Sequence, residues 1–273
     1  MSTLIIPFVS AGNVPQLCTD LLLHSLREEF RFIKELNSKW LHAFLGPLDY
    51  ADKNDNPLYS GSPSKRYTTP LELFYNKKRD TYVIQQRSPV FEGHENEFCK
   101  QVLVPLIQEL APKRVLILDS ISPFESNVPV SSNTESRFSV GTCAVSSIDD
   151  VAREFAEGLH ISKEGELSVN KNLFSFTAQS FQDGISTEQF IFKFIYHLLN
   201  SVVPMSSSLD SVIYIAMSIN EGDNNQDAQL MCEMLPQLWD GFPKITKFTA
   251  PVSWNGVYGS RPIPDGYDEG LYV

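Results

Sequence analysis

Hydrophobic residues along this chain form two kinds of segment, which alternate over most of its length. Apolar residues spaced three and four apart predict amphipathic helices, and continuous or alternating apolar runs predict strands. The expected helices span residues 15–26, 95–110, 188–199 and 225–239, and the expected strands span residues 4–9, 40–45, 71–75, 81–84, 114–119 and 211–217. Because strands that alternate with helices are typical of crossover units, the pattern predicts a three-layer α/β/α fold with a largely parallel central sheet.

Polar segments separate these elements and set the expected domain organisation. Residues 46–69, 120–137 and 204–210 are loops by composition, with Pro, Ser and other turn-forming residues. The sequence shows no internal repeat and no clean domain boundary, so we expect one α/β domain with long loops over residues 1–257. Residues 258–273 combine Gly, Pro and charged residues, which predicts a flexible, solvated tail.

The tail ends in a hydrophobic residue, a tyrosine and a free carboxylate, at Leu271, Tyr272 and Val273. A site that accepts such an end needs an apolar slot, a wall with a hydrogen-bond partner for the tyrosine, and a cation or amide nest for the carboxylate. On this triplet alone, a terminus without a role is the better interpretation, because short motifs often match by chance.

The charge of the chain argues against nucleic acid as a partner. There are 22 Lys and Arg against 33 Asp and Glu, and the formal net charge of −11 opposes binding to a polyphosphate. The one dense basic cluster, Lys77, Lys78 and Arg79, lies between two expected strands and predicts a solvated hairpin turn. Contact between this cluster and an acidic partner surface stays open.

The cysteines and the first residues indicate the compartment. Four cysteines lie far apart and form no CxxC pair, which predicts small buried thiols in a reducing compartment, at Cys18, Cys99, Cys143 and Cys232. The start has no basic region, and Pro7 breaks its apolar run, so we expect no signal peptide. No apolar run approaches the ~18 residues of a membrane span. We therefore expect a cytoplasmic protein with no membrane contact, and the nucleus stays open as a second location.

Candidate chemistry is sparse. Ser10–Asn13 is a polar turn before a helix, but it lacks the glycines and the lysine of a phosphate-binding loop. Asn220–Asn224 offers Glu221 and Asp223 to a cation or a ribose hydroxyl, although the same residues suit a helix cap. Ser180–Gly184 is another polar turn. The five histidines show no metal-ligand spacing, and no serine lies in a Gly-x-Ser-x-Gly motif. We therefore expect no catalytic residue, no cofactor and no metal.

Seven short blocks, taken in order, resemble one family from end to end. The blocks occupy residues 7–17, 46–49, 74–79, 84–87, 180–183, 220–224 and 253–259. Their order, together with the C-terminal triplet, is similar to the fungal type of the proteasome assembly chaperone 2 family. The segments 50–69 and 120–137 match weakly, so partner contacts there stay open.

This resemblance implies a fold distantly related to nucleoside phosphorylases, no enzymatic activity, and a heterodimer with proteasome assembly chaperone 1. The pair is expected to cap the outer face of the 20S proteasome α ring during assembly. The family's C-terminal hydrophobic-Tyr-X (HbYX) ends enter pockets between α subunits, which implies partner-binding roles for Leu271, Tyr272 and Val273. The alternative is a small-molecule enzyme of nucleoside phosphorylase or hydrolase type that uses Glu221 or Asp223.

Overall fold

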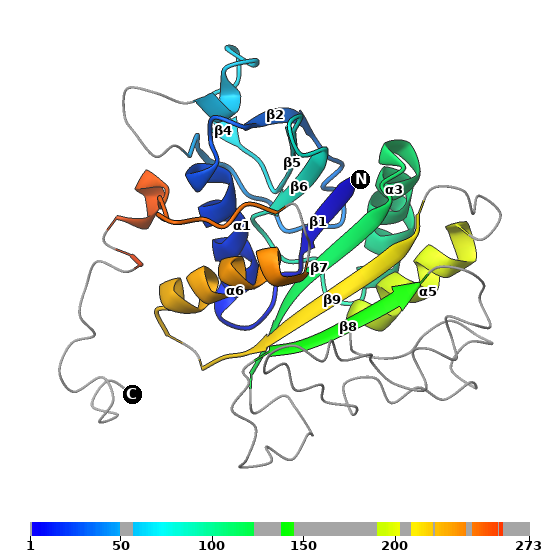
Figure 1. Cartoon of the computed structure of the whole chain (residues 1–273). Coiled ribbons are helices and arrows are strands. Elements are labelled where there is room, and N and C mark those ends of the chain that lie inside the picture. Colours follow the sequence, from blue (N-terminus) through cyan, green and yellow to red (C-terminus); the bar gives the residue numbers. More distant parts are fainter. Residues whose placement is uncertain are drawn as a thin grey trace, which may run out of the picture.

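A seven-stranded mixed sheet forms the centre of the molecule, in the order β2-β5-β6-β1-β7-β9-β8 (Figure 1). The computed structural model describes residues 2–49, 57–122, 138–144, 190–202, 209–220, 222–238, 242–255 and 257–258. The strands are β1 Thr3–Pro7, β2 Phe30–Glu35, β5 Leu71–Asn76, β6 Thr81–Gln86, β7 Arg114–Ile121, β8 Phe138–Ala144 and β9 Ser211–Ser218. A separate two-stranded sheet pairs β3 Gly46–Pro47 with β4 Tyr67–Thr68.

The four central strands, β6, β1, β7 and β9, are parallel to one another. At the edges, β5 pairs antiparallel with β6, β2 with β5, and β8 with β9. The central strands are continuously apolar because both of their faces are covered. In β1, for example, Leu4 and Ile6 join the core on one face and Ile5 joins the core on the other.

Helices cover both faces of the sheet and complete the three layers (Figure 1). On one face lie α1 and α6, and on the other lie α2, α3 and α5. Their bounds are α1 Val14–Ser25, α2 Glu95–Phe98, α3 Val104–Leu110, α5 Phe190–Val202 and α6 Asn225–Leu238. The segment Cys99–Leu103 between α2 and α3 is π-helical, so residues 95–110 form one continuous helical stretch as expected. None of the helices in the described ranges is long and apolar enough to cross a membrane.

The structure confirms the predicted α/β/α architecture and corrects one strand. The predicted strand at 40–45 is wrong, because within it only Leu41 makes a ladder contact, a single bridge to Val90. The strand on this side of the sheet is β2, ten residues earlier in the chain. The pattern missed β2 because its alternation is broken by a bulge between Phe32 and Lys34, which leaves the intervening Ile33 47% exposed. β8 was also not predicted.

Two smaller predictions fall within the described residues. Cys18, Cys99 and Cys232 are buried thiols, as expected, whereas the side chain of Cys143 lies outside the described set. The basic cluster forms the turn of the β5–β6 hairpin, as predicted. Lys78 and Arg79 of that turn form ion pairs with Glu29.

Candidate functional site

The sequence-predicted docking residues Leu271, Tyr272 and Val273 lie outside the described residues, as do Glu221 and the turn 180–184. The division into a domain over 1–257 and a tail over 258–273 therefore stays a prediction. What the structure does describe is the segment from which this tail continues, together with the polar side chains that hold it against the body.

The loops at the carboxyl ends of the parallel strands are tied to one another. Ser10, after β1, shares a hydrogen bond of 2.9 Å with Ser120 near the end of β7. Asn224, after β9, donates its side-chain amide to the carbonyl oxygen of Gly12 at 3.2 Å. At Gly12, φ is +60°, and an added Cβ would lie 2.2 Å from the Asn224 amide nitrogen. The Asn224 side chain therefore closes the place where a glycine turn would hold a phosphate.

Asp223 and Asn224 also set the start of α6, in agreement with the helix-cap interpretation. The Asp223 carboxylate accepts a hydrogen bond of 3.2 Å from the backbone N–H of Asn225. The Asn224 carbonyl accepts the first helical bond, from Ala228, at 2.9 Å. A carboxylate near this end complements the helix dipole. The structure thus gives both residues a place in the fold.

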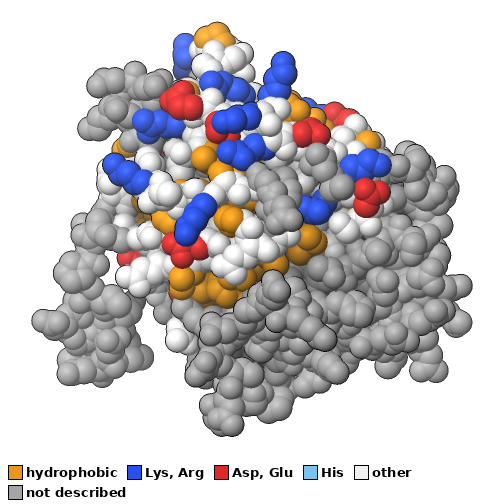
Figure 2. Space-filling view, in the orientation of Figure 1, with side chains coloured by type: hydrophobic (Ala, Val, Ile, Leu, Met, Phe, Trp, Pro, Cys, Tyr) orange, Lys and Arg blue, Asp and Glu red, His pale blue; other side chains and the backbone are white. Residues whose placement is uncertain are grey.

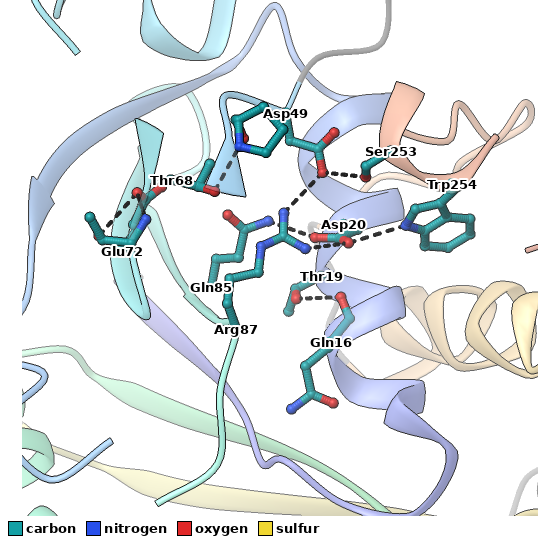
Figure 3. A network of polar contacts seen from close by, with 12 residues as sticks. Gln16, Thr19, Asp20, Asp49, Thr68, Glu72, Gln85, Arg87, Ser253 and Trp254 are labelled. Atoms are coloured by element: carbon teal, nitrogen blue, oxygen red, sulfur yellow. Dashed lines mark hydrogen bonds and ion pairs between the residues drawn. The ribbon is translucent and has the colours of Figure 1, made fainter. Parts of the chain in front are cut away.

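A buried ionic cluster, which we call the Arg87 clasp, joins distant parts of the chain (Figure 3). The Arg87 guanidinium, just after β6, contacts Asp20 of α1 at 2.8 Å and Asp49 of the loop after β3 at 3.1 Å. The Trp254 indole donates to Asp20 at 3.3 Å, and the Ser253 hydroxyl donates to Asp49 at 2.8 Å. One arginine therefore joins two carboxylates, and each carboxylate holds one residue of the C-terminal segment.

Neighbouring side chains support the clasp. Gln85 donates its amide to the second oxygen of Asp20 at 2.6 Å. Arg87 keeps only 15% of its side chain exposed, Asp49 8% and Asp20 2%. Because an unpaired charge at such depth is costly, each member depends on the others.

The C-terminal segment 242–258, which we call the tail root, lies along α1 (Figure 1). Trp254 is 4% exposed and belongs to the same core as α1 and α6. The Thr249 backbone N–H donates to the Ser25 hydroxyl at 2.9 Å, near the end of α1. Tyr258, the last described residue, stacks edge-on against Trp254 with ring centroids 5.4 Å apart. The chain is thus fixed to the body immediately before its predicted tail.

The charges of the clasp are shaped by burial and by each other. Burial raises the pKa of Asp49, and nearby Asp20 adds to the rise, which exceeds the lowering by Arg87 and Ser253. Burial alone would lower the pKa of Arg87, but Asp20 and Asp49 outweigh it and keep the guanidinium charged. The carboxylates thus already accept hydrogen bonds from protein groups, an arrangement that suits a structural connection.

His24 lies one helical turn beyond Asp20 on α1. Burial lowers the pKa of His24 to about 4, helped by Arg87 and Arg27 and opposed by Asp20. Both of its ring nitrogens are buried, and neither has a hydrogen-bond partner among the described residues. The imidazole is therefore neutral at pH 7.

Sequence reasoning had not identified the clasp. Its members are separated by 67 positions between Asp20 and Arg87 and by 204 between Asp49 and Ser253. One local signal was present, because Asp20 interrupts the otherwise apolar run of α1. A charged residue in a fully buried helix requires a partner. Over the described residues, no group of three His, Cys, Asp or Glu side chains is placed to hold a metal ion.

Comparisons with known proteins identify relatives along the whole chain. The family model described as the PAC2 family matches residues 4–238. Proteasome assembly chaperone 2 of Saccharomyces cerevisiae is 36% identical over 270 residues, which is 98% of both chains. Proteasome assembly chaperone 2 of Xenopus laevis is 26% identical over 271 residues, covering 97% of this chain and 94% of the frog protein.

One solved structure is similar in fold. The crystal structure of Pyrococcus furiosus PbaB, described as an archaeal proteasome activator, superposes with a TM-score of 0.50. The match covers 90% of this chain and 86% of the archaeal chain, at 11% sequence identity. At this level of identity the likeness concerns the fold alone. The expected relation to nucleoside phosphorylases stays a prediction.

Proposed function

The chain belongs to the PAC2 family, and on this basis we propose that it is a non-catalytic chaperone of 20S proteasome assembly. The observation that carries the proposal is the end-to-end similarity to the yeast protein named proteasome assembly chaperone 2. This match confirms the resemblance that the seven sequence blocks indicated. It extends beyond residue 238, where the family model ends, and so includes the tail root.

We propose that the chain works as a heterodimer with proteasome assembly chaperone 1 and binds the outer face of the α ring. Leu271, Tyr272 and Val273 then dock in a pocket between α subunits. The described tail root supports this arrangement, because it attaches the chain firmly to the body 15 residues before the carboxylate. At ~3.3–3.6 Å per residue, an extended tail of this length reaches at most about 50 Å.

The proposed mechanism is avidity. A single short tail binds weakly, but a heterodimer that presents two tails and a body surface gains from effective concentration. Such a complex holds α subunits in register and leaves when the pockets change on maturation. The cytoplasm is the proposed site of action, with the nucleus as a possible second compartment of assembly.

The enzyme alternative gains no specific support from the carboxyl edge of the sheet. Asp223 is engaged with the start of α6, and Asn224 fills the space beside Gly12. The proposal is therefore tested by identifying partners. We would purify the tagged full chain from cells under native conditions and identify the co-purifying chains by mass spectrometry.

We expect a second PAC2-family chain in equal amount, together with proteasome α subunits and few β subunits. A matched purification with the three terminal residues deleted should keep the second chaperone and lose α subunits. Recovery of neither a second chaperone chain nor any proteasome subunit from assembling cells would contradict the proposed function.

A further inference from the structure

The tail root is held by side chains that are specific in direction, which simple packing does not require. Trp254 is buried against the core, yet its indole N–H also points to Asp20. Ser253 belongs to an exposed position, yet its hydroxyl turns inward to Asp49. A third attachment, from the Thr249 N–H to Ser25, fixes the segment several residues earlier.

Charged groups are an expensive way to attach a segment. Burying Arg87 with two carboxylates sacrifices their hydration, and an apolar contact of similar volume is often as stable. What hydrogen-bonded charges add is a single defined geometry. In the clasp, that geometry places Ser253 and Trp254 relative to α1, β6 and the loop after β3.

We propose that Asp20, Asp49 and Arg87 are positioning residues that fix the point at which the docking tail leaves the body. This inference rests on the proposed docking of the tail. Its content is separate: the clasp determines the length of the free tether and the place from which the tail starts. The surface around this point carries Lys and Arg side chains interspersed with carboxylates (Figure 2).

The effect of losing the clasp can be calculated from chain length. With the root attached, the tether covers residues 259–273, which is 15 residues. With the root released from the body, the tether covers residues 242–273, which is 32 residues. For a tail that samples its reach freely, effective concentration falls roughly as the −3/2 power of tether length, so tail docking weakens about threefold.

The test combines Ser253→Ala with Trp254→Phe in the full chain with its co-purified partner chaperone. This pair removes both hydrogen bonds from the root to the clasp while leaving the ionic centre and an aromatic ring in place. Hydrogen exchange by mass spectrometry would follow peptides within 249–258, and interferometry would measure binding to isolated α rings. Matched controls are Ser253→Thr, which keeps the hydroxyl, and Asn255→Ala, an exposed neighbour.

We expect faster exchange confined to the tail root and α-ring binding that is about threefold weaker. Both controls should behave as the unmodified chain. A flexible 17-residue Gly-Ser insertion after Tyr258, with the clasp intact, gives the same tether length and should produce the same loss. That match separates positioning from a merely structural effect.

Three outcomes overturn the inference. Unchanged exchange in the double variant would show that the clasp does not hold the root. Faster exchange with unchanged α-ring binding would show that a fixed exit point is irrelevant to docking, while leaving the proposed function intact. If deletion of residues 271–273 also leaves α-ring binding unchanged, the proposed docking itself fails, and positioning fails with it.

Discussion

The Arg87 clasp and the ion-pair cluster of the β5–β6 hairpin lie at opposite ends of the sheet and use the same chemistry at different depths. In the clasp, one arginine serves two carboxylates whose side chains are at most 8% exposed. In the hairpin cluster, Glu29 receives Lys78 and Arg79, and Lys78 keeps 71% of its side chain exposed. The clasp joins four separate parts of the chain, whereas the hairpin cluster joins one turn to the start of β2.

Depth therefore decides what each cluster does. An exposed ion pair exchanges easily with water and salt, so it contributes little to stability and can be lost without consequence. A buried pair cannot be opened without leaving a charge uncompensated. The clasp consequently constrains position, and the hairpin cluster mainly keeps a turn soluble.

The largest expected effect comes from Arg87→Met. The substitution leaves Asp20 and Asp49 buried without their cation, which should lower the free energy of unfolding by about 3–5 kcal/mol. Urea denaturation followed by fluorescence of the three tryptophans would measure the change. A loss no greater than that of Lys78→Met would remove the distinction between the two clusters.

His24, beside the clasp, should make the protein sensitive to acid. Its folded pKa of about 4 lies below the ordinary 6.5, so the neutral form stabilises the fold above pH 6.5 and this contribution is lost as the pH falls toward 4. Between pH 7.5 and pH 5, His24→Leu should lose about 2 kcal/mol less stability than the unmodified chain. The exposed His42→Gln variant serves as the control. Parallel pH curves for all three proteins would contradict the expectation.

Asp49 and Glu29 should respond to pH with opposite signs. Burial raises the pKa of Asp49, so its contribution grows as the pH falls through the folded pKa. Burial would also raise the pKa of Glu29, but hydrogen bonds from Asn76, Lys78 and Arg79 outweigh it and lower the pKa. The contribution of Glu29 is therefore present above about pH 4.5 and lost below that.

The measurement compares the unmodified chain with Asp49→Asn and with Glu29→Gln from pH 6.5 to pH 3.5. Taking differences at each pH cancels the other titrating groups. As the pH falls, the advantage of the unmodified chain over Asp49→Asn should grow, and its advantage over Glu29→Gln should shrink. Two differences that change in the same direction would show that the clusters share one environment.

The smallest effect is expected for Lys78→Met. Its ammonium is mostly exposed, and such pairs contribute about 0.2–1 kcal/mol. Thermal unfolding at low and at high salt would detect the change, which should diminish when salt screens the pair in the unmodified chain. A loss that persists unchanged at 1 M salt would place this pair with the buried ones.

The sequence allowed the central layers to be predicted, but not the contacts among them. β1, β7 and β9 are continuous apolar runs, and such runs indicate buried strands whatever their neighbours are. β2 was missed because Arg31 and the bulge at Ile33 disturb its alternation. The strand predicted at 40–45 had the right composition, but its residues form an irregular loop beside residues 88–91.

The clasp was beyond local patterns because its pairing depends on the completed fold. Arg87 and Asp20 meet only once β6 lies beside β1 and α1 covers that face. The segments around Arg87 and Trp254 did belong to the blocks that carried the family resemblance. The resemblance thus included parts of the site without indicating how they come together.

The most direct test of the central claim is the affinity of the full heterodimer for isolated α rings. Three forms would be compared by interferometry: the unmodified chain, a chain without residues 271–273, and a chain extended by one residue after Val273. Deletion removes the aromatic and apolar anchors, and extension displaces the carboxylate alone. The account predicts that deletion weakens binding more than about tenfold, that extension also weakens it, and that heterodimer formation is unaffected. Equal affinity of all three forms would contradict it.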